Sequence, residues 1–414
     1  MYPRTIGMYT GFDRMNTVFM TKAQRHKKMI KPLLIVALCA ILALFLGLQR
    51  DRLFPSSSLQ SSSSNSSPST SSKLAHVLSQ NSIQAIHNNT LGFGDVYFIH
   101  MPGRTDKLDS LRLLTSITNI SYTIIPGVDG KGIPHVAWPG FYKEGERATS
   151  ITGCWRAHIN AAASILDNNL SSALILEDDA DWDVSLKNQL TQFALGTRHI
   201  LDAPTSSEPL SPYGDGWDML WLGHCAQNKP TKPFSRFIIA NDTTVRPAGH
   251  RWHLWNPEPT LTYDLPHNRT TRVVYRSAGG MCSYAYALSY TGAQKLLYYL
   301  SYSHFNDPVD VGHSRLCKRG SKGEIDFSCV VPYPGLVYTA SVQNDIEYHP
   351  DKPRKDRDKK KGAPGARNLV FGVRANMKNI IEGKEAEGRG GEEEKIREEM
   401  GEMGMWFDEG KTEL

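Results

Sequence analysis

Short apolar runs alternate with amphipathic stretches through the middle of the chain. Residues 95–101 (DVYFIHM) and 121–126 (SYTIIP) are rich in β-branched and aromatic side chains, which is typical of strands. The leucines of residues 106–115 recur at helical spacing, and residues 148–168 place apolar side chains on one helical face over several turns. This pattern predicts strands that are joined by helices.

The alternation continues further along the chain. Residues 173–176 (ALIL) predict a short buried strand, and residues 218–223 and 283–288 predict two more, the last of them followed by a helix. Residues 224–275 are rich in proline and histidine and are interpreted as a long irregular excursion. Strands that alternate with helices predict an α/β domain over residues 92–350, with a mainly parallel sheet flanked by helices.

The chain before this domain has three parts. Residues 1–31 are polar and basic, and residues 33–48 are apolar and uncharged. We interpret residues 32–50 as one transmembrane anchor, because no A-x-A cleavage site follows the apolar run; a signal peptide is the alternative. Residues 51–91 are serine-rich and are expected to form a flexible stem. The positive-inside rule then predicts a single-pass type II protein of the Golgi or ER membrane, with a cytosolic N-terminal tail and a lumenal domain.

The C-terminal part of the sequence is strongly charged. Residues 351–361 (DKPRKDRDKKK) are mostly basic, and glycine and glutamate dominate after residue 383. Such segments bury little apolar surface, so residues 351–414 are expected to form a charged, disordered tail. The formal net charge of +5 averages over unlike parts of the chain, and we expect no nucleic-acid partner from it.

Six cysteines in 414 residues are too few for a disulfide-stapled small domain, and no C-x-x-C pair suggests a zinc site. Cys39 lies in the apolar run. Among the other five we expect Cys317 and Cys329 to form a local disulfide, although the spacing leaves other pairings open. Six Asn-x-Ser/Thr sequons, together with an anchor, favour a glycosylated lumenal surface. They lie at Asn65, Asn88, Asn119, Asn169, Asn241 and Asn268.

The candidate chemistry directly follows the third predicted strand. Glu177, Asp178 and Asp179 are consecutive, and Asp181 and Asp183 come next. Ligands of open α/β sheets bind beyond the carboxyl ends of strands, and adjacent carboxylates repel one another unless a cation lies between them. Carboxylate oxygens suit Mg²⁺ or Mn²⁺, which commonly bridge protein carboxylates to a phosphate-bearing substrate.

Helix capping is the alternative role for these acids. Asp179 or Asp183 could begin the next helix, while the other carboxylates favour its N-terminal dipole. Neither G-x-G-x-x-G nor G-x-x-x-x-G-K-[ST] lies at a strand–helix junction, so ordinary dinucleotide-binding and P-loop classes lack support. Contiguous acids also fit a glycoside hydrolase poorly, because its two carboxyl groups lie about 5–9.5 Å apart.

Residues 173–180 (ALILEDDA), after residues 153–158 (GCWRAH), resemble the core of glycosyltransferase family 25, which includes lipooligosaccharide and procollagen galactosyltransferases. Further resemblances follow in chain order at residues 96–106 (VYFIHMPGRTD), 128–130 (VDG), 284–293 (YAYALSYTGA) and 308–310 (PVD). Together they cover most of residues 93–346. The chain departs from the family at His100, where an asparagine is usual, and lacks a second arginine near Lys107.

The resemblance implies a GT-A-like fold and the inverting transfer of a hexose, galactose or glucose, from a UDP-sugar to a glycan or glycoprotein acceptor. It implies Mn²⁺ (or Mg²⁺) as the cofactor. By position, Asp178 and Asp179 would bind the metal and the diphosphate, with Asp181 as a further metal ligand. Glu177 lies beside them as a donor-binding residue.

Other residues are candidates for donor binding and catalysis. The guanidinium group of Arg104 could donate two parallel hydrogen bonds to the diphosphate, with Asp106 beside it as a donor-binding residue. The alternative is that Arg104 is a surface residue at the start of a helix with no role in binding. Asp310 is a candidate base, as is Asp179, and a base must lie within hydrogen-bond reach of the acceptor hydroxyl. A helix N-cap is the alternative for Asp310. The alternative to an enzyme is a non-catalytic lumenal sugar-binding or adaptor protein that keeps the fold.

Overall fold

The computed structural model describes much of the chain from residue 83 onward. The described residues are 83–140, 146–201, 209–231, 234–247, 251, 270–303, 307–340, 365–388 and 404–408, with the backbone alone for 146–148 and 404–408. Residues 69–414 form one compact unit. The predicted anchor at residues 32–50 lies outside the described ranges, and within them no helix is both long and apolar enough to cross a membrane.

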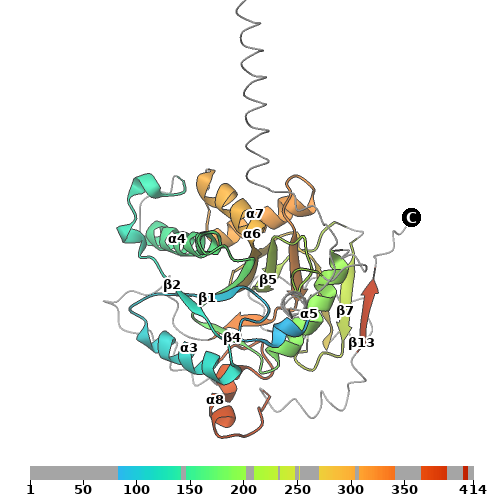
Figure 1. Cartoon of the computed structure of the whole chain (residues 1–414). Helices are drawn as coiled ribbons and strands as arrows, with labels where there is room; N and C mark the ends of the chain where they lie inside the picture. Colours follow the sequence, from blue (N-terminus) through green and yellow to red (C-terminus); the bar gives the residue numbers. More distant parts are fainter. Residues whose placement is uncertain are drawn as a thin grey trace, which may run out of the picture. The chain divides into compact units, whose positions relative to one another are not determined.

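A sheet of nine strands forms the centre of the domain, in the order β13-β7-β8-β11-β5-β10-β3-β1-β2 (Figure 1). The strands are β1 (Asp95–His100), β2 (Thr123–Pro126), β3 (Ser172–Glu177), β5 (Met219–Gly223), β7 (Arg236–Ala240), β8 (Arg272–Arg276), β10 (Ala285–Ser289), β11 (Cys329–Tyr333) and β13 (Gly404–Asp408). β1 pairs in parallel with β2 and β3, and β5 with β11. The other pairings are antiparallel. The prediction of a mainly parallel sheet was therefore wrong: β10 runs against both of its neighbours, and β7, β8 and β13 form an antiparallel edge.

Helices cover both faces of this mixed sheet. They are α3 (Thr105–Thr118), α4 (Glu146–Asp167), α5 (Leu186–Ile200), α6 (Tyr290–Leu297), α7 (Val309–Ser321) and α8 (Val373–Ile381). α4, α6 and α7 lie together on one face, where Trp155 and Leu316 join one hydrophobic core. α3 and α5 contribute Leu111 and Phe193 to a second core on the other face. A large central sheet between two helical layers fits a GT-A-like architecture.

Residues 224–275, predicted as an irregular excursion, contribute β7 and β8 to the sheet. All of β7 and all but the last residue of β8 are buried, so no alternation of polar and apolar residues marks either strand in the sequence. Short strands pair outside the main sheet, β4 (Ala180–Trp182) with β12 (Val337–Thr339), and β6 (Ala226–Gln227) with β9 (Gly280–Met281). Single-turn elements are η1 (Ile83–His87), η2 (Gly130–Gly132), η3 (His135–Ala137) and the π-helical η6 (Tyr298–Tyr302).

The folded part extends beyond both boundaries that the sequence predicted for the domain. At the N-terminal side, η1 was expected in the stem, but it packs on α5 and buries Ile86 completely. At the C-terminal side, residues 365–388 were expected in the disordered tail. They contain α8, whose first residue Val373 is fully buried, and β13 pairs with β7 still further along the chain.

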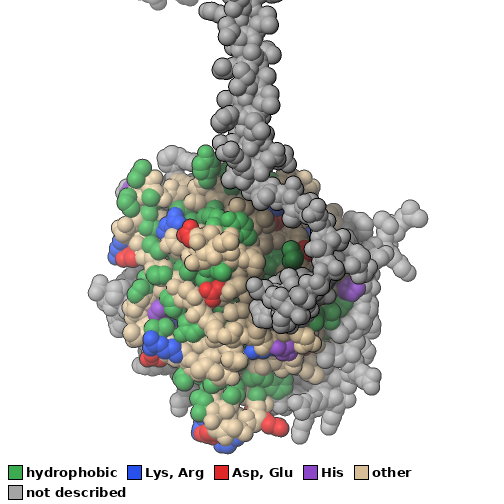
Figure 2. All heavy atoms as spheres, viewed as in Figure 1, with side chains coloured by type: hydrophobic (Ala, Val, Ile, Leu, Met, Phe, Trp, Pro, Cys, Tyr) green, Lys and Arg blue, Asp and Glu red, His purple; other side chains and the backbone are tan. Residues whose placement is uncertain are grey.

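Two disulfides tie the domain together. Cys317 of α7 bonds to Cys329 of β11, the local pair that the sequence analysis named, and Cys225 bonds to Cys282. Cys154 is the one described cysteine outside these pairs. Charged side chains of the described residues are scattered over the face that Figure 2 shows and form no large patch of one sign there.

A buried histidine predicts how stability depends on pH. His224 Nε2–H donates to the Pro332 carbonyl oxygen at 2.9 Å, and burial lowers the pKa of His224 to about 4 despite this bond. Because this pKa lies below the unfolded value, the unfolded chain binds more protons between pH 4 and 6.5, and stability falls as the pH drops through that window. Going from pH 7 to pH 5 should cost about 1–2 kcal/mol of unfolding free energy through His224.

The variant His224→Gln should therefore lose less stability than the wild type over the same pH range. Chemical denaturation at pH 7 and pH 5 measures both changes. His135→Gln, which alters an exposed ring, is the matched control and should follow the wild type. Equal losses in all three proteins would contradict the prediction.

Candidate functional site

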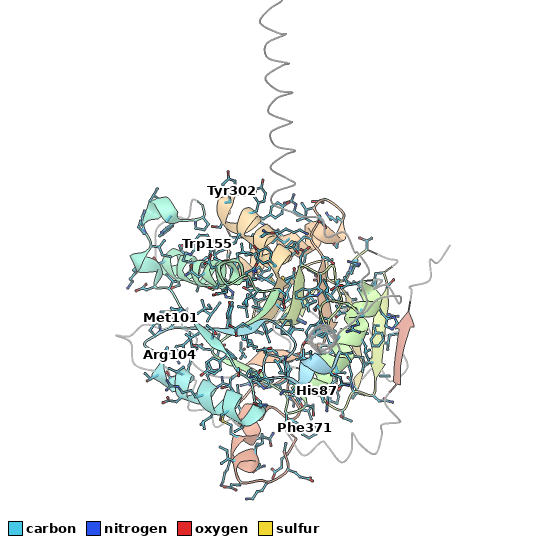
Figure 3. All side chains as sticks on the ribbon, in the orientation of Figure 1. His87, Met101, Arg104, Trp155, Tyr302 and Phe371 are labelled. Atoms are coloured by element: carbon cyan, nitrogen blue, oxygen red, sulfur yellow. A yellow bond between two sulfur atoms is a disulfide. The ribbon has the colours of Figure 1, made fainter. Side chains whose placement is uncertain are left out.

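The candidate site lies at the carboxyl ends of β1 and β3, which are parallel neighbours. Their register places Glu177, the last residue of β3, beside the end of β1. β1 continues into α3 through a short loop on which Figure 3 labels Met101 and Arg104. Side chains from two strand ends and from the first turn of α3 therefore converge at this edge.

Asp178 is held by two nitrogen-bearing side chains. His100 Nδ1–H donates to Asp178 Oδ2 at 2.8 Å, and Lys107 Nζ donates to Asp178 Oδ1 at 2.7 Å. The side chains of Lys107 and Asp178 are only 3% and 5% exposed. Both carboxylate oxygens of Asp178 are thus engaged inside the protein.

Lys107 also reaches the next carboxylate. Its Nζ lies 3.3 Å from Asp179 Oδ2. Burial raises the pKa of Asp179 to about 6, although the positive charge of Lys107 acts in the opposite direction. Asp179 Oδ1 and His100 Nε2 are buried and have no hydrogen-bond partner among the described residues. The ammonium group of Lys107 therefore forms ion pairs with two neighbouring carboxylates, and its positive charge offsets the repulsion between them.

Glu177 has the most accessible carboxylate of the acidic segment. Its side chain is 33% exposed, compared with 13% for Asp179. His158 Nε2 lies 3.8 Å from Glu177 Oε1, and His158 Nδ1 is 2.9 Å from the Tyr286 hydroxyl. Tyr284 borders the same acids, because its carbonyl oxygen accepts from Glu177 N–H at 3.1 Å; burial and the negative charges of Glu177 and Asp179 raise the pKa of its hydroxyl. A ligand in this part of the site would meet Glu177 before the more buried aspartates.

Asp181 and Asp183 are directed into the C-terminal segment instead of the site. Asp181 accepts hydrogen bonds from the backbone N–H groups of Ala366 at 2.9 Å and Arg374 at 3.1 Å. Asp183 accepts from Phe371 N–H at 3.1 Å. Both aspartates are fully buried. The structure therefore does not bring Asp181 together with Asp178 and Asp179 as a metal ligand, because its oxygens are used to hold residues 365–381.

The guanidinium group of Arg374 completes this connection. Its Nε donates to the Ala180 carbonyl oxygen and its Nη2 donates to the Asp178 carbonyl oxygen, both at 3.1 Å. A third bond joins Nη1 to the Ser110 hydroxyl of α3. Arg374 therefore fixes the backbone of the acidic turn from the side of α8.

Arg104 and Asp106, predicted to bind the donor, pair with each other at the start of α3. Arg104 Nε and Nη2 donate to the two oxygens of Asp106 at 2.9 and 2.8 Å. This pairing, with Arg104 as the main cause, lowers the pKa of Asp106 to about 2. Both residues thus lie on the β1–α3 side of the site, with the Asp106 carboxylate held ionised by its neighbour.

Asp310, the predicted base, lies in the first turn of α7. Its Oδ2 accepts from Cys282 N–H at 3.1 Å and its Oδ1 from Val311 N–H at 2.9 Å. Cys282 and the next two residues lead into β10, which is antiparallel to β3. Asp310 is therefore near the same edge of the sheet as Glu177, and its carboxylate is oriented by two backbone donors.

The donor set, as it is arranged, does not fit a divalent cation. Asp178 has both oxygens engaged, Asp181 is turned away, and Asp179 offers one buried oxygen without a partner. Across the described part of the chain, no three His, Cys, Asp or Glu side chains gather in a metal-binding arrangement. An ammonium group stands between the two aspartates where a shared cation would be needed.

Sequence reasoning gave no role to Lys107, Tyr284 or Arg374. The departure from the family pattern near Lys107 is a signal that could have drawn attention to it. Arg374 carried no such signal, because it lies 196 residues from Asp178, between two stretches whose charged and glycine-rich composition is typical of disorder.

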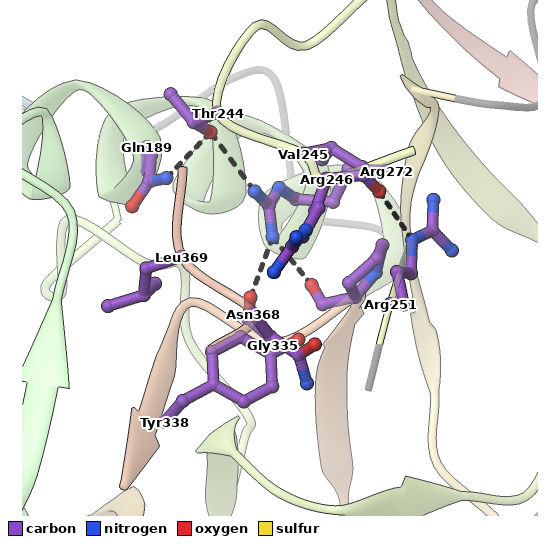
Figure 4. A pocket seen from close by; sticks show the side chains of 11 residues that line it. Gln189, Thr244, Val245, Arg246, Arg251, Arg272, Gly335, Tyr338, Asn368 and Leu369 are labelled. Carbon is purple, nitrogen blue, oxygen red and sulfur yellow. Dashed lines mark hydrogen bonds between the residues drawn. The ribbon is translucent and has the colours of Figure 1, made fainter. Parts of the chain in front are cut away.

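A small pocket lined by Arg246, Arg251 and Arg272 is a second candidate for a binding site (Figure 4). Arg272 donates through Nε to Asp242 and through its terminal nitrogens to Thr244 and two backbone carbonyl groups. Arg251 Nε donates to the Arg246 carbonyl oxygen at 2.7 Å. Because these donors already have acceptors within the protein, the acidic edge remains the stronger candidate.

The predicted glycosylation sites differ in accessibility. Asn88, Asn119 and Asn169 are exposed. Asn241 is 4% exposed and buried in the fold, which does not suit a glycan. Asn65 and Asn268 lie outside the described residues.

The variant Arg374→Ala tests whether the C-terminal segment holds the acidic turn. The substitution removes the three hydrogen bonds of the guanidinium group and the positive charge that α8 brings to the acidic turn. The unfolding free energy should therefore fall by about 2–4 kcal/mol. Chemical denaturation measures the change. Lys378→Ala, on the same helix with an 83% exposed side chain, should change stability by less than about 0.5 kcal/mol. Similar effects of the two substitutions would show that Arg374 has no special role.

Partial likenesses to known proteins include two procollagen galactosyltransferases, while no protein-family model matches the chain. The chain is 26% identical to procollagen galactosyltransferase 1 of Danio rerio over 156 residues, which are 34% of this chain and 23% of that protein. It is 25% identical to procollagen galactosyltransferase 2 of Mus musculus over 111 residues, which are 24% of this chain and 18% of that protein. The matched stretch thus spans less than a quarter of each relative. At this coarse level, the likenesses support a glycosyltransferase-like relationship for the chain.

Proposed function

We propose that the chain is a glycosyltransferase that moves a hexose from a UDP-sugar to a glycan or glycoprotein acceptor. The observation that carries the proposal is the acidic segment at the carboxyl ends of the parallel strands β1 and β3, where ligands of α/β sheets bind. The names of the two relatives favour galactose over glucose as the transferred sugar.

The reaction that we propose is a direct displacement. The acceptor hydroxyl oxygen forms a bond to the anomeric carbon while the bond from that carbon to the diphosphate oxygen breaks, and UDP leaves with the electron pair. The hydroxyl proton passes to a carboxylate. Asp310, held by two backbone donors, and Glu177, the most accessible acid, are the residues proposed for this step.

We also propose that the protein is a single-pass type II protein of the Golgi or ER membrane with its domain in the lumen. The apolar run within residues 32–50 and the exposed sequons at Asn88, Asn119 and Asn169 support this location. Two disulfides are compatible with an oxidising compartment.

Release of UDP from UDP-galactose and UDP-glucose tests the proposed function. The full-length protein is assayed with Mn²⁺, with Mg²⁺ and with EDTA, which also tests the expected need for a metal. Asp310→Asn should lower turnover by about 100-fold or more if Asp310 is the base, and Glu177→Gln should do so if Glu177 is. Asp109→Asn, at a 72% exposed side chain of α3, is the matched control.

If the folded protein neither binds nor turns over either donor under any of these conditions, the non-catalytic sugar-binding or adaptor function replaces the enzyme. Turnover that survives both substitutions would instead place the base elsewhere in the site.

A further inference from the structure

The ammonium group of Lys107 lies between the two aspartates that the sequence offered as metal ligands. Its Nζ is 2.7 Å from Asp178 Oδ1 and 3.3 Å from Asp179 Oδ2, and the side chain is 3% exposed. On the other side of Asp178, His100 engages the second oxygen at 2.8 Å. Lys107 is thus bound to both carboxylates at a buried position.

A protonated lysine and a divalent cation exclude one another at this position. Both would need the same oxygens, and two positive charges a few ångströms apart repel strongly where water does not screen them. If the ammonium group left, Asp178 and Asp179 would remain as adjacent, nearly buried anions, which is unfavourable without another cation. The arrangement of these residues therefore favours the lysine over a metal ion.

A second cation of the chain, Arg374, lies close to the same acidic turn and also contacts Ser110 of α3. Arg374 donates to the Asp178 and Ala180 carbonyl oxygens, and its positive charge acts on Asp178, Asp179 and Asp181. The negative charge of the acidic turn is thus offset by side chains of the protein itself.

We infer that Lys107 takes the place of a divalent cation, so that the site binds a nucleoside diphosphate sugar without a resident metal ion. The identity of the ligand rests on the proposed function, whereas the replacement of the metal by Lys107 is a property of the chain alone.

Binding of Mn²⁺ to the full-length protein tests the inference without any turnover. Electron paramagnetic resonance measures free Mn²⁺ as the ion is titrated into the wild type, Lys107→Met and the double variant Lys107→Met/Asp179→Asn. Methionine keeps much of the length of the lysine stem without its charge, so Lys107→Met should bind Mn²⁺ at least about tenfold more tightly than the wild type. The second substitution should remove the gained affinity.

Lys107→Arg keeps the charge and should resemble the wild type in this titration, and thermal unfolding verifies that each variant is folded. Stoichiometric binding of Mn²⁺ to the wild type with a Kd below about 0.1 mM, lost in Asp179→Asn, would overturn the inference even if Lys107→Met did not fold. A folded Lys107→Met without any gain in affinity would overturn it as well.

Calorimetric binding of UDP to the wild type gives a second readout. The Kd should agree within about threefold in EDTA and in Mn²⁺, since a threefold change corresponds to less than 1 kcal/mol. Binding that requires Mn²⁺ would overturn the inference. If UDP binds under neither condition, the proposed function fails, while the Mn²⁺ titration still decides the role of Lys107.

Discussion

Five carboxylates within seven residues at the end of β3 set the constraint on which much of this fold depends. Three of them, Asp178, Asp181 and Asp183, are buried, and Asp179 is nearly so. An ionised carboxylate that loses water without gaining partners is strongly destabilising. Hydrogen-bond donors and positive charges from other parts of the chain must therefore contact this turn. These contacts determine which other segments belong to the domain.

The partners of these carboxylates come from three segments of the chain. β1 supplies His100, α3 supplies Lys107, and the C-terminal segment supplies backbone N–H groups together with Arg374. His100, Lys107 and the backbone N–H groups donate to the buried carboxylates, while Arg374 donates to backbone carbonyl oxygens of the same turn. Residues 365–381 consequently belong to the structured body, although their neighbours in the sequence are rich in charge and glycine. The same contacts hold the acidic turn in one conformation at the edge of the sheet.

The five acids thus fall into those that stabilise the fold and those that are placed to contact a ligand. Asp181 and Asp183 hold the fold, Asp178 and Asp179 share one lysine, and Glu177 keeps the exposure that contact with a ligand requires. A run of acids in a sequence can thus contain several different roles. The likeness to procollagen galactosyltransferases covers too little of either chain to distinguish these roles, so they depend on the geometry.

The sequence by itself determined the elements that local periodicity encodes: β1, α3, α4 and β3, and the position of the acidic segment after a buried strand. It did not reveal β7 and β8, because these short, mostly buried strands carry no alternation and lie in a stretch rich in proline and histidine. Nor did it predict that β10 runs antiparallel to β3, since strand direction depends on how connections cross the sheet.

The environment of the acids was decided only by the tertiary structure. Lys107 and Arg374 lie 71 and 196 residues from Asp178 in the sequence, and folding alone brings them together. Hydrophobic periodicity reports which residues are buried, and it does so over a few turns of helix or strand. The pairing of a positive charge with a particular carboxylate depends on residues that are far apart in the sequence. In this protein, that pairing determines whether the acidic segment binds a metal ion or a lysine side chain.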